Sequence, residues 1–392
     1  MAILNWLVPT RALRKLSDEQ SPRVTNMELF FDLVYVFTII QLSHYLLEHQ
    51  TITGVIESIT LFAAIWWAWN YTAWSTNWIN PDHGAGRLFM VALMACALTM
   101  AIAMPYAFTE RAWMFVGAYV TMALLRAFYM AALFRGERMG QNYAQLGAWS
   151  CFSALFWVAG VLVPEQRLLL WGIAVLVEYA APFVGFWLPG AGATPMDTWP
   201  LKGLHLLERN QQVFIIALGE SILLLGGTLV AQTLSMPTVF AAGIGFALIV
   251  VLWWLYFLHT TEHGEHAFTS ASDHTKLARA GLAYAHGIMV CGAIAVAVAI
   301  ELILAHPLDA VHLETVLIAV LGPCIFLVGS AAFHRTMADR YPYIYLFAML
   351  ALPAWGYLAL NWHVTGLVLG GGVLGILLVL VALAARGPAE KN

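Results

Sequence analysis

Long apolar stretches separated by short polar connections make up most of the chain. Twelve of these stretches approach the roughly 20 residues that a helix needs to cross a membrane. They predict an all-α integral membrane protein with about twelve transmembrane helices. The predicted spans are 28–48, 54–76, 86–109, 111–134, 142–163, 168–188, 205–232, 237–260, 277–305, 313–334, 342–361 and 364–385.

The positions of Lys and Arg agree with this count of spans. Cytoplasmic loops of membrane proteins are enriched in these cations. If the N-terminus is cytoplasmic, only Arg111 and Arg167 of the 18 Lys and Arg residues fall in outer connections, and Arg126 falls inside a span. We therefore predict a multi-pass protein of the bacterial cytoplasmic (inner) membrane, with both termini in the cytoplasm.

The two halves of the chain resemble each other. Glu28 opens the first span and Glu208 opens the seventh, while Arg87 precedes the third span and Arg279 the ninth. Six spans separate the equivalents, so the pattern indicates two parallel six-helix repeats. The predicted divisions are a cytoplasmic arm at 1–27, a first repeat at 28–188, a linker at 189–204, a second repeat at 205–385 and a cytoplasmic tail at 386–392.

Composition narrows the class of protein further. Hydrophobic residues make up 61% of the chain and charged residues 10%, against about 25% charged in soluble domains. The net charge of −4 argues against nucleic acid as a partner. We find no phosphate loop and no nucleophile elbow, and the four cysteines show no metal or disulfide spacing. No cofactor is predicted, and an enzyme is less favoured than a transporter.

Charged side chains inside a membrane are costly, so each is a functional candidate. Glu28 and Asp32 lie four residues apart, on one face of a helix that enters the membrane. Arg126, in the fourth predicted span, needs a counter-charge or access to water. We predict a salt bridge from Arg126 to Asp32 or Glu28.

The second half contributes a further set of candidates. His205, Glu208 and Gln212 are spaced three and four residues apart and share a helical face. Glu220 lies near the middle of the same span, where a helix-end preference does not explain an acid. The predicted substrate- or ion-binding residues are therefore Glu28, Asp32, Arg126, His205, Glu208, Gln212, Glu220 and His286.

A metal site is a weaker alternative. His259, Glu262, His263 and His266 have a spacing that would align them on one helical face as ligands. A solvated cytoplasmic loop explains the same residues, and Gly264 disfavours the helix. We therefore predict no metal from the sequence.

Three motifs resemble one known family. They are Glu28-Leu-Phe-Phe-Asp-Leu-Val, His205-Leu-Leu-Glu followed by Ile216-Ala-Leu-Gly-Glu-Ser, and Ala285-His286. In combination they are similar to the bacterial low temperature requirement A (LtrA) proteins. This resemblance implies a polytopic membrane protein linked by name to growth in the cold. The first motif is also similar to the Phe-Ser-Asp motif that opens the pore helix of an endolysosomal potassium channel family.

The favoured function is a transporter or channel for a small solute or ion that uses intramembrane carboxylates. The alternatives are a membrane-embedded enzyme acting on lipids, through His205, Glu208 or the His259 group, and a membrane sensor or assembly protein. Geometry distinguishes them, since transport needs polar residues at a cavity and a binding protein can have paired charges in a dry core. The expected partners are the lipid bilayer and an unidentified solute, with homo-oligomerisation left open.

Overall fold

The structure is a computed structural model that describes residues 12–14, 23–231, 234–271, 273–339 and 342–385. These residues form helices and no strand, which confirms the predicted all-α class. Within the described ranges, 11 helices are long and apolar enough to cross a membrane. The chain is therefore a multi-pass membrane protein.

Internal contacts divide the chain into two compact units. Unit 1 comprises Met1–Gln212 and Ser272–Ala278, and unit 2 comprises Val213–Ala271 and Arg279–Asn392. The predicted repeat and its domain boundaries stay predictions. The candidate site described below lies within unit 1.

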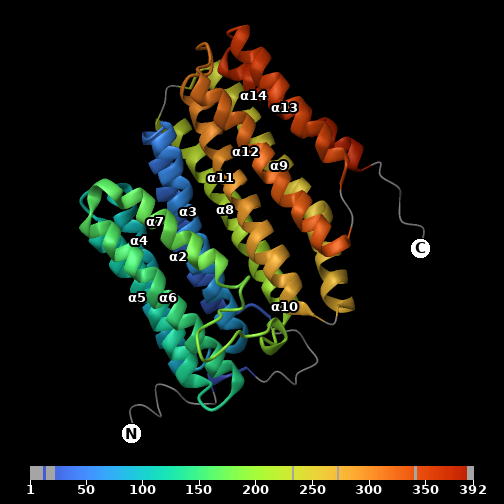
Figure 1. Ribbon diagram of the computed structural model, residues 1–392. Coiled ribbons are helices and arrows are strands. Elements are labelled where there is room, and N and C mark those ends of the chain that lie inside the picture. The colour runs from blue at the N-terminus through green and yellow to red at the C-terminus, as the bar shows by residue number, and fades with distance from the viewer. Residues whose placement is uncertain (1–11, 15–22, 232–233, 272, 340–341, 386–392) are drawn as a thin grey trace. The chain divides into compact units, whose positions relative to one another are not determined.

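Unit 1 is a bundle in which neighbouring helices pack side by side (Figure 1). Within it α2 packs against α3 and α4, α4 against α5, α5 against α6, and α6 against α7. The long helices are α2 (Asn26–Glu48), α3 (Ile52–Trp78), α4 (Gly84–Ala103), α5 (Ala112–Leu133), α6 (Arg138–Leu162) and α7 (Arg167–Ala180), together with α8 (Gly203–Ala231) as far as Gln212. The short elements are η2 (Met104–Tyr106), η3 (Pro164–Gln166), η4 (Met196–Thr198) and α10 (His274–Leu277).

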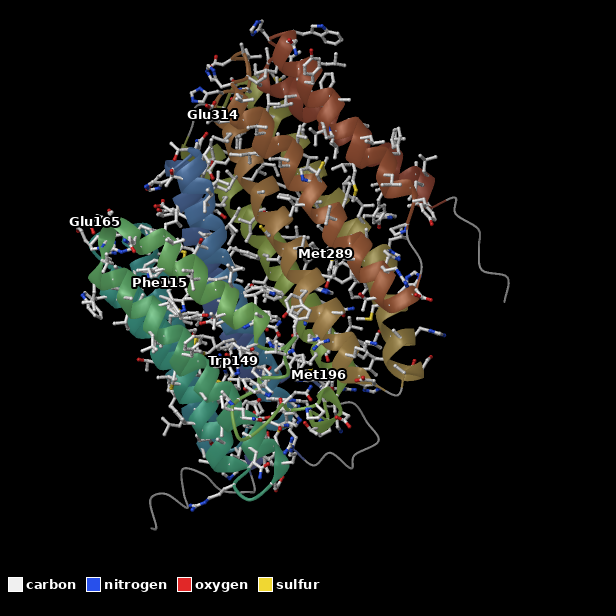
Figure 2. All side chains as sticks on the ribbon, viewed as in Figure 1. Phe115, Trp149, Glu165, Met196, Met289 and Glu314 are labelled. Atoms are coloured by element: carbon white, nitrogen blue, oxygen red, sulfur yellow. The ribbon has the colours of Figure 1, made fainter. Side chains whose placement is uncertain are left out.

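Aromatic residues fill the core between α5, α6 and α7. Trp157 and Trp171 are fully buried, with ring centroids 5.3 Å apart. Phe115, labelled in Figure 2, lies 5.7 Å from the ring of Trp171. Aromatic contacts of this kind add stability beyond that given by the buried area alone. They therefore stabilise the packing of these three helices against one another.

Helix α7 is shorter than its predicted span of 168–188. It ends at Ala180 after 14 residues, a length of about 21 Å against the roughly 30 Å of a bilayer core. Pro182 disfavours helical geometry in the residue before it, and turns with positive φ follow at Gly185 and Phe186. The spanning length predicted for this segment was therefore wrong.

Hydrogen bonds from side chains of α3 and α6 hold the connection from α7 to α8 in place. The Trp149 indole donates to the Trp187 carbonyl over 3.1 Å, and the Asn142 amide donates to Thr198. Asn77 exchanges two hydrogen bonds with the backbone of Lys202, of 2.8 and 3.0 Å. These bonds fix where α8 begins, and therefore where its first polar residues lie.

Unit 2 contains the rest of α8 and the helices α9 to α14, apart from α10. Their bounds are α9 (Met236–Ser270), the π-helix η5 (Ala278–Ala285), α11 (His286–Ala305), α12 (Leu313–Ala338), α13 (Ile344–Asn361) and α14 (Gly366–Ala384). The most extensive helix–helix contact in this unit is between α11 and α12. A Cβ added at Gly292 of α11 would lie 2.3 Å from the backbone nitrogen of Phe326. Small residues let membrane helices approach in this way.

We predict that Gly292→Ala destabilises the protein by about 1–3 kcal/mol, because backbone atoms of α12 occupy the space of the new methyl group. Gly243→Ala is the matched control, since Gly243 is helical, exposed and meets nothing within 4 Å. It should be neutral or slightly stabilising. Thermal unfolding in detergent compares the two, and equal midpoints would contradict the close approach of α11 and α12.

Candidate functional site

Glu28 caps the start of α2 and points into the protein. The Thr25 hydroxyl accepts a hydrogen bond from the Glu28 backbone, and the Glu28 carboxylate accepts one from the Thr25 backbone over 2.9 Å. This reciprocal capping box stabilises the helix start. The Glu28 side chain is nevertheless fully buried, so its charge needs partners beyond the cap.

Asp32, one turn further along α2, is held by a cation from α8. Arg209 donates from Nε to one oxygen over 3.1 Å and from Nη2 to the other over 2.7 Å. The indole of Trp69 on α3 donates to Asp32 over 2.8 Å. A two-pronged guanidinium–carboxylate contact is among the strongest hydrogen-bonded pairs in proteins.

The same arginine also reaches the capping glutamate. Nη1 of Arg209 lies 3.1 Å from Oε1 of Glu28 and donates to the Thr76 hydroxyl over 3.0 Å. Arg209 is fully buried. One guanidinium therefore joins both carboxylates of α2 to residues of α3 and α8.

His205, one turn before Arg209, completes this face of α8. The Asn77 amide nitrogen, whose orientation is fixed by Lys202, lies 3.2 Å from His205 Nδ1. An amide nitrogen only donates, so Nδ1 accepts and Nε2 carries the proton. That Nε2 lies 3.1 Å from Glu28 Oε1, which directs the N–H of the imidazole toward the carboxylate.

A short segment of the N-terminal arm closes the cluster. Arg14 donates from Nη2 to Glu28 over 3.0 Å and from Nε to the Ile79 carbonyl over 2.8 Å. The backbones of Ala12 and Arg14 bond to Asn80 and Trp78. With two carboxylates and two guanidiniums, the formal charges balance, and we name Arg14, Glu28, Asp32, His205 and Arg209 the charge cluster.

Arg126 lies outside the charge cluster, so the predicted salt bridge to Asp32 or Glu28 is wrong. Nη1 of Arg126 donates to the Ala68 carbonyl over 3.0 Å and to the Thr72 hydroxyl over 3.2 Å. Its guanidinium carbon lies 5.2 Å from the centre of the Tyr71 ring. Across the described ranges, no carboxylate forms an ion pair with Arg126, because Arg209 already occupies both acids of α2.

A pocket in unit 1 adjoins Arg126. Residues of α3, α5, α6 and α7 line it, among them Trp67, Tyr71, Tyr119, Arg126, Trp149 and Glu178. Its volume of about 20 Å³ is enough for about one water molecule. Trp149, labelled in Figure 2, contributes from α6. The pocket therefore places a buried cation and a buried acid at a cavity inside the bundle.

Glu178 of α7 is bound by neutral donors. Oε1 accepts from the Ser153 hydroxyl over 2.7 Å and from the Trp157 indole over 3.0 Å. Oε2 accepts from the Tyr119 hydroxyl. Glu178 is thus fully engaged without an ion pair, although it borders the same pocket as Arg126.

The remaining predicted residues belong neither to the charge cluster nor to the lining of the Arg126 pocket. The Gln212 amide donates to Glu208 over 3.3 Å, and neither residue contacts the charge cluster. In unit 2, His286 donates from Nδ1 to the Gly281 carbonyl over 3.0 Å, and its Nε2 lies within hydrogen-bond distance of the Tyr256 hydroxyl, at 2.7 Å. These bonds hold the imidazole ring in an aromatic surrounding.

The predicted metal set is only partly covered by the structure. The side chains of His259, Glu262 and Glu220 lie outside the described residues. The His263 ring contacts the His334 ring, with centroids 4.9 Å apart, and His266 is exposed. Where side chains are described, no group of three or more His, Cys, Asp or Glu residues has the arrangement of a metal site.

Comparison with known families agrees with the motifs that build the charge cluster. The family described as bacterial low temperature requirement A protein (LtrA) matches residues 23–385, nearly the whole chain. The chain belongs to the LtrA family. This membership confirms the resemblance found in the sequence. The matched region contains the Arg126 pocket and all of the charge cluster except Arg14.

The chain is also similar to a curated protein from Rhizobium meliloti (strain 1021). The two sequences are 33% identical over 348 residues, which is 88% of this chain and 85% of the relative. That relative is described as uncharacterized. The comparison extends the likeness along most of both chains and assigns no activity.

Sequence reasoning missed Arg209, the centre of the charge cluster of this LtrA chain. It was counted among the cations of an inner connection, because it lies close to the start of the predicted seventh span, 205–232. A helical signal was present, since Arg209 follows His205 by four residues and shares its face. Arg14 gave no comparable signal, because its contact depends on how the arm folds back onto α3.

We predict that Arg209→Gln destabilises the protein by about 3–5 kcal/mol, because it leaves two buried carboxylates without their main counter-charge. The double variant Asp32→Asn with Arg209→Gln should lose less than the sum of the two single changes. Arg87→Gln, at a side chain 58% exposed, is the control and should change stability by less than about 0.5 kcal/mol.

Thermal unfolding midpoints in detergent report these differences. Strict additivity of the two single changes would contradict a direct coupling between Arg209 and Asp32.

Proposed function

We propose that this LtrA chain is a transporter or channel for a small solute or ion in the bacterial cytoplasmic membrane, with both termini in the cytoplasm. The observation that supports it is the pocket of unit 1, where buried Arg126 and Glu178 border a cavity among membrane helices. Ionisable residues at a cavity inside a membrane are typical of solute and ion pathways. The bias of Lys and Arg toward one set of connections supports the orientation.

The two charged sites take different roles in this proposal. Arg126 has unused N–H groups beside a cavity, so it is the residue that meets the solute. Both oxygens of Asp32 and Oε2 of Glu28 accept hydrogen bonds from protein donors, and Oε1 of Glu28 lies 3.1 Å from Nη1 of Arg209. We assign them to holding α2, α3 and the start of α8 together around that pathway.

A second candidate, a membrane sensor or assembly protein, is favoured by one feature. All of the charge cluster except Arg14 is fully buried, and both of its carboxylates are paired with guanidiniums, as expected for a core that serves only to fix a binding surface. A lipid enzyme gains no such support, because His205 is held between Glu28 and Asn77. Transport and binding are therefore the two functions to separate.

We predict flux above that of empty vesicles when the purified protein is reconstituted and tested with proton, sodium, potassium, chloride and small organic solutes. Ala123 lines the pocket, so Ala123→Leu should fill the cavity and lower the flux at least tenfold. Ala132→Leu is the matched control, because Ala132 lies on the same helix and is exposed. It should transport like the unchanged protein.

Equal flux through both leucine variants would contradict the pocket as the pathway. No flux across the whole panel, from protein that is folded by thermal unfolding, would favour the sensor or assembly function.

A further inference from the structure

Among the residues that the structure describes, no carboxylate forms an ion pair with the guanidinium of Arg126. The side chain is 1% exposed, and only Nη1 is engaged, by the Ala68 carbonyl and the Thr72 hydroxyl. Its buried Nε has no hydrogen-bond partner among the described residues. A lone cation in a membrane interior costs several kcal/mol unless it is paired or reaches water. Arg126 therefore needs a partner, and the described residues do not provide one.

The space beside Arg126 has a defined size and chemistry. The cavity of about 20 Å³ accommodates about one water-sized particle. Aromatic residues from three helices surround it, including Tyr71, Tyr119 and Trp149.

We propose that the pocket binds one small inorganic anion of about the size of chloride, with Arg126 as its principal ligand. A water molecule would accept hydrogen bonds from the free N–H groups but would carry no charge. An anion would accept the same hydrogen bonds and would also pair with the positive charge of the guanidinium. A phosphate or a carboxylic acid metabolite is larger than the cavity. This inference rests on the pocket used in the proposed function and names the class of its solute.

Glu178 acts against the anion. Its carboxylate borders the same pocket, and its charge is spread over Ser153, Trp157 and Tyr119 rather than cancelled by a cation. Like charges at short range in a low-dielectric surrounding repel. The affinity is therefore set by the opposed effects of Arg126 and Glu178, and changes at the two residues have opposite signs.

Chloride binding can be measured on the full chain in detergent. Chloride is titrated against gluconate at constant ionic strength, with the unfolding midpoint and tryptophan fluorescence as readouts, because a ligand of the native state raises that midpoint. We expect a saturable rise for the unchanged protein. Arg126→Gln should weaken apparent chloride affinity at least tenfold, and Glu178→Gln should strengthen it by a similar factor.

Controls separate this site from general salt effects. Arg87→Gln removes an exposed cation and should respond like the unchanged protein. If Arg126→Gln does not fold, Ala123→Leu keeps both charges and fills the cavity, so it should lose the chloride response while Ala132→Leu keeps it. An equal response in all variants, or none in the unchanged protein, overturns the anion site.

The assay needs no membrane, so it is independent of transport. Chloride binding without flux would overturn the transport proposal and leave the anion site intact. Cation flux through a folded protein that shows no response to chloride would overturn the anion site and leave the transport proposal intact.

Discussion

A single guanidinium joins α2, α3 and the start of α8. Arg209 contacts both Asp32 and Glu28, 177 and 181 residues earlier in the chain, and all three side chains are fully buried. Because an unpaired carboxylate in this surrounding costs several kcal/mol, α8 must start at the position and rotation that point Arg209 at α2. The bonds between Asn77 and Lys202 set that start, and Trp69 and Thr76 bring α3 to the same place.

The charge cluster and the Arg126 pocket are chemically opposite. In the cluster, two carboxylates meet two guanidiniums, and an imidazole N–H faces Glu28. At the pocket, a cation and an acid border one cavity without touching, each held by neutral groups. A closed set of pairs stabilises one arrangement of helices, whereas an uncompensated charge beside a cavity is suited to a charged ligand. This difference is why we assign structure to the first and solute contact to the second.

Hydropathy was sufficient for the class of fold, because crossing a bilayer requires long apolar helices whatever their arrangement. The span that hydropathy predicted for α7 was too long, because the helix ends before Pro182 and the turns at Gly185 and Phe186. The sequence identified Glu28, Asp32, His205 and Arg126 as costly residues, but it does not show which helices meet. The partner of Asp32 was therefore assigned to Arg126 instead of Arg209, and Glu178 was left out of the predicted set.

The most direct test of these two roles is an anomalous difference map from crystals of the protein grown in bromide. The account predicts a bromide peak beside the guanidinium of Arg126, in the pocket bordered by Tyr71 and Tyr119. It predicts none at Arg209, whose N–H groups already face Asp32, Glu28 and Thr76. A peak at Arg209, or no peak at Arg126, would contradict the account.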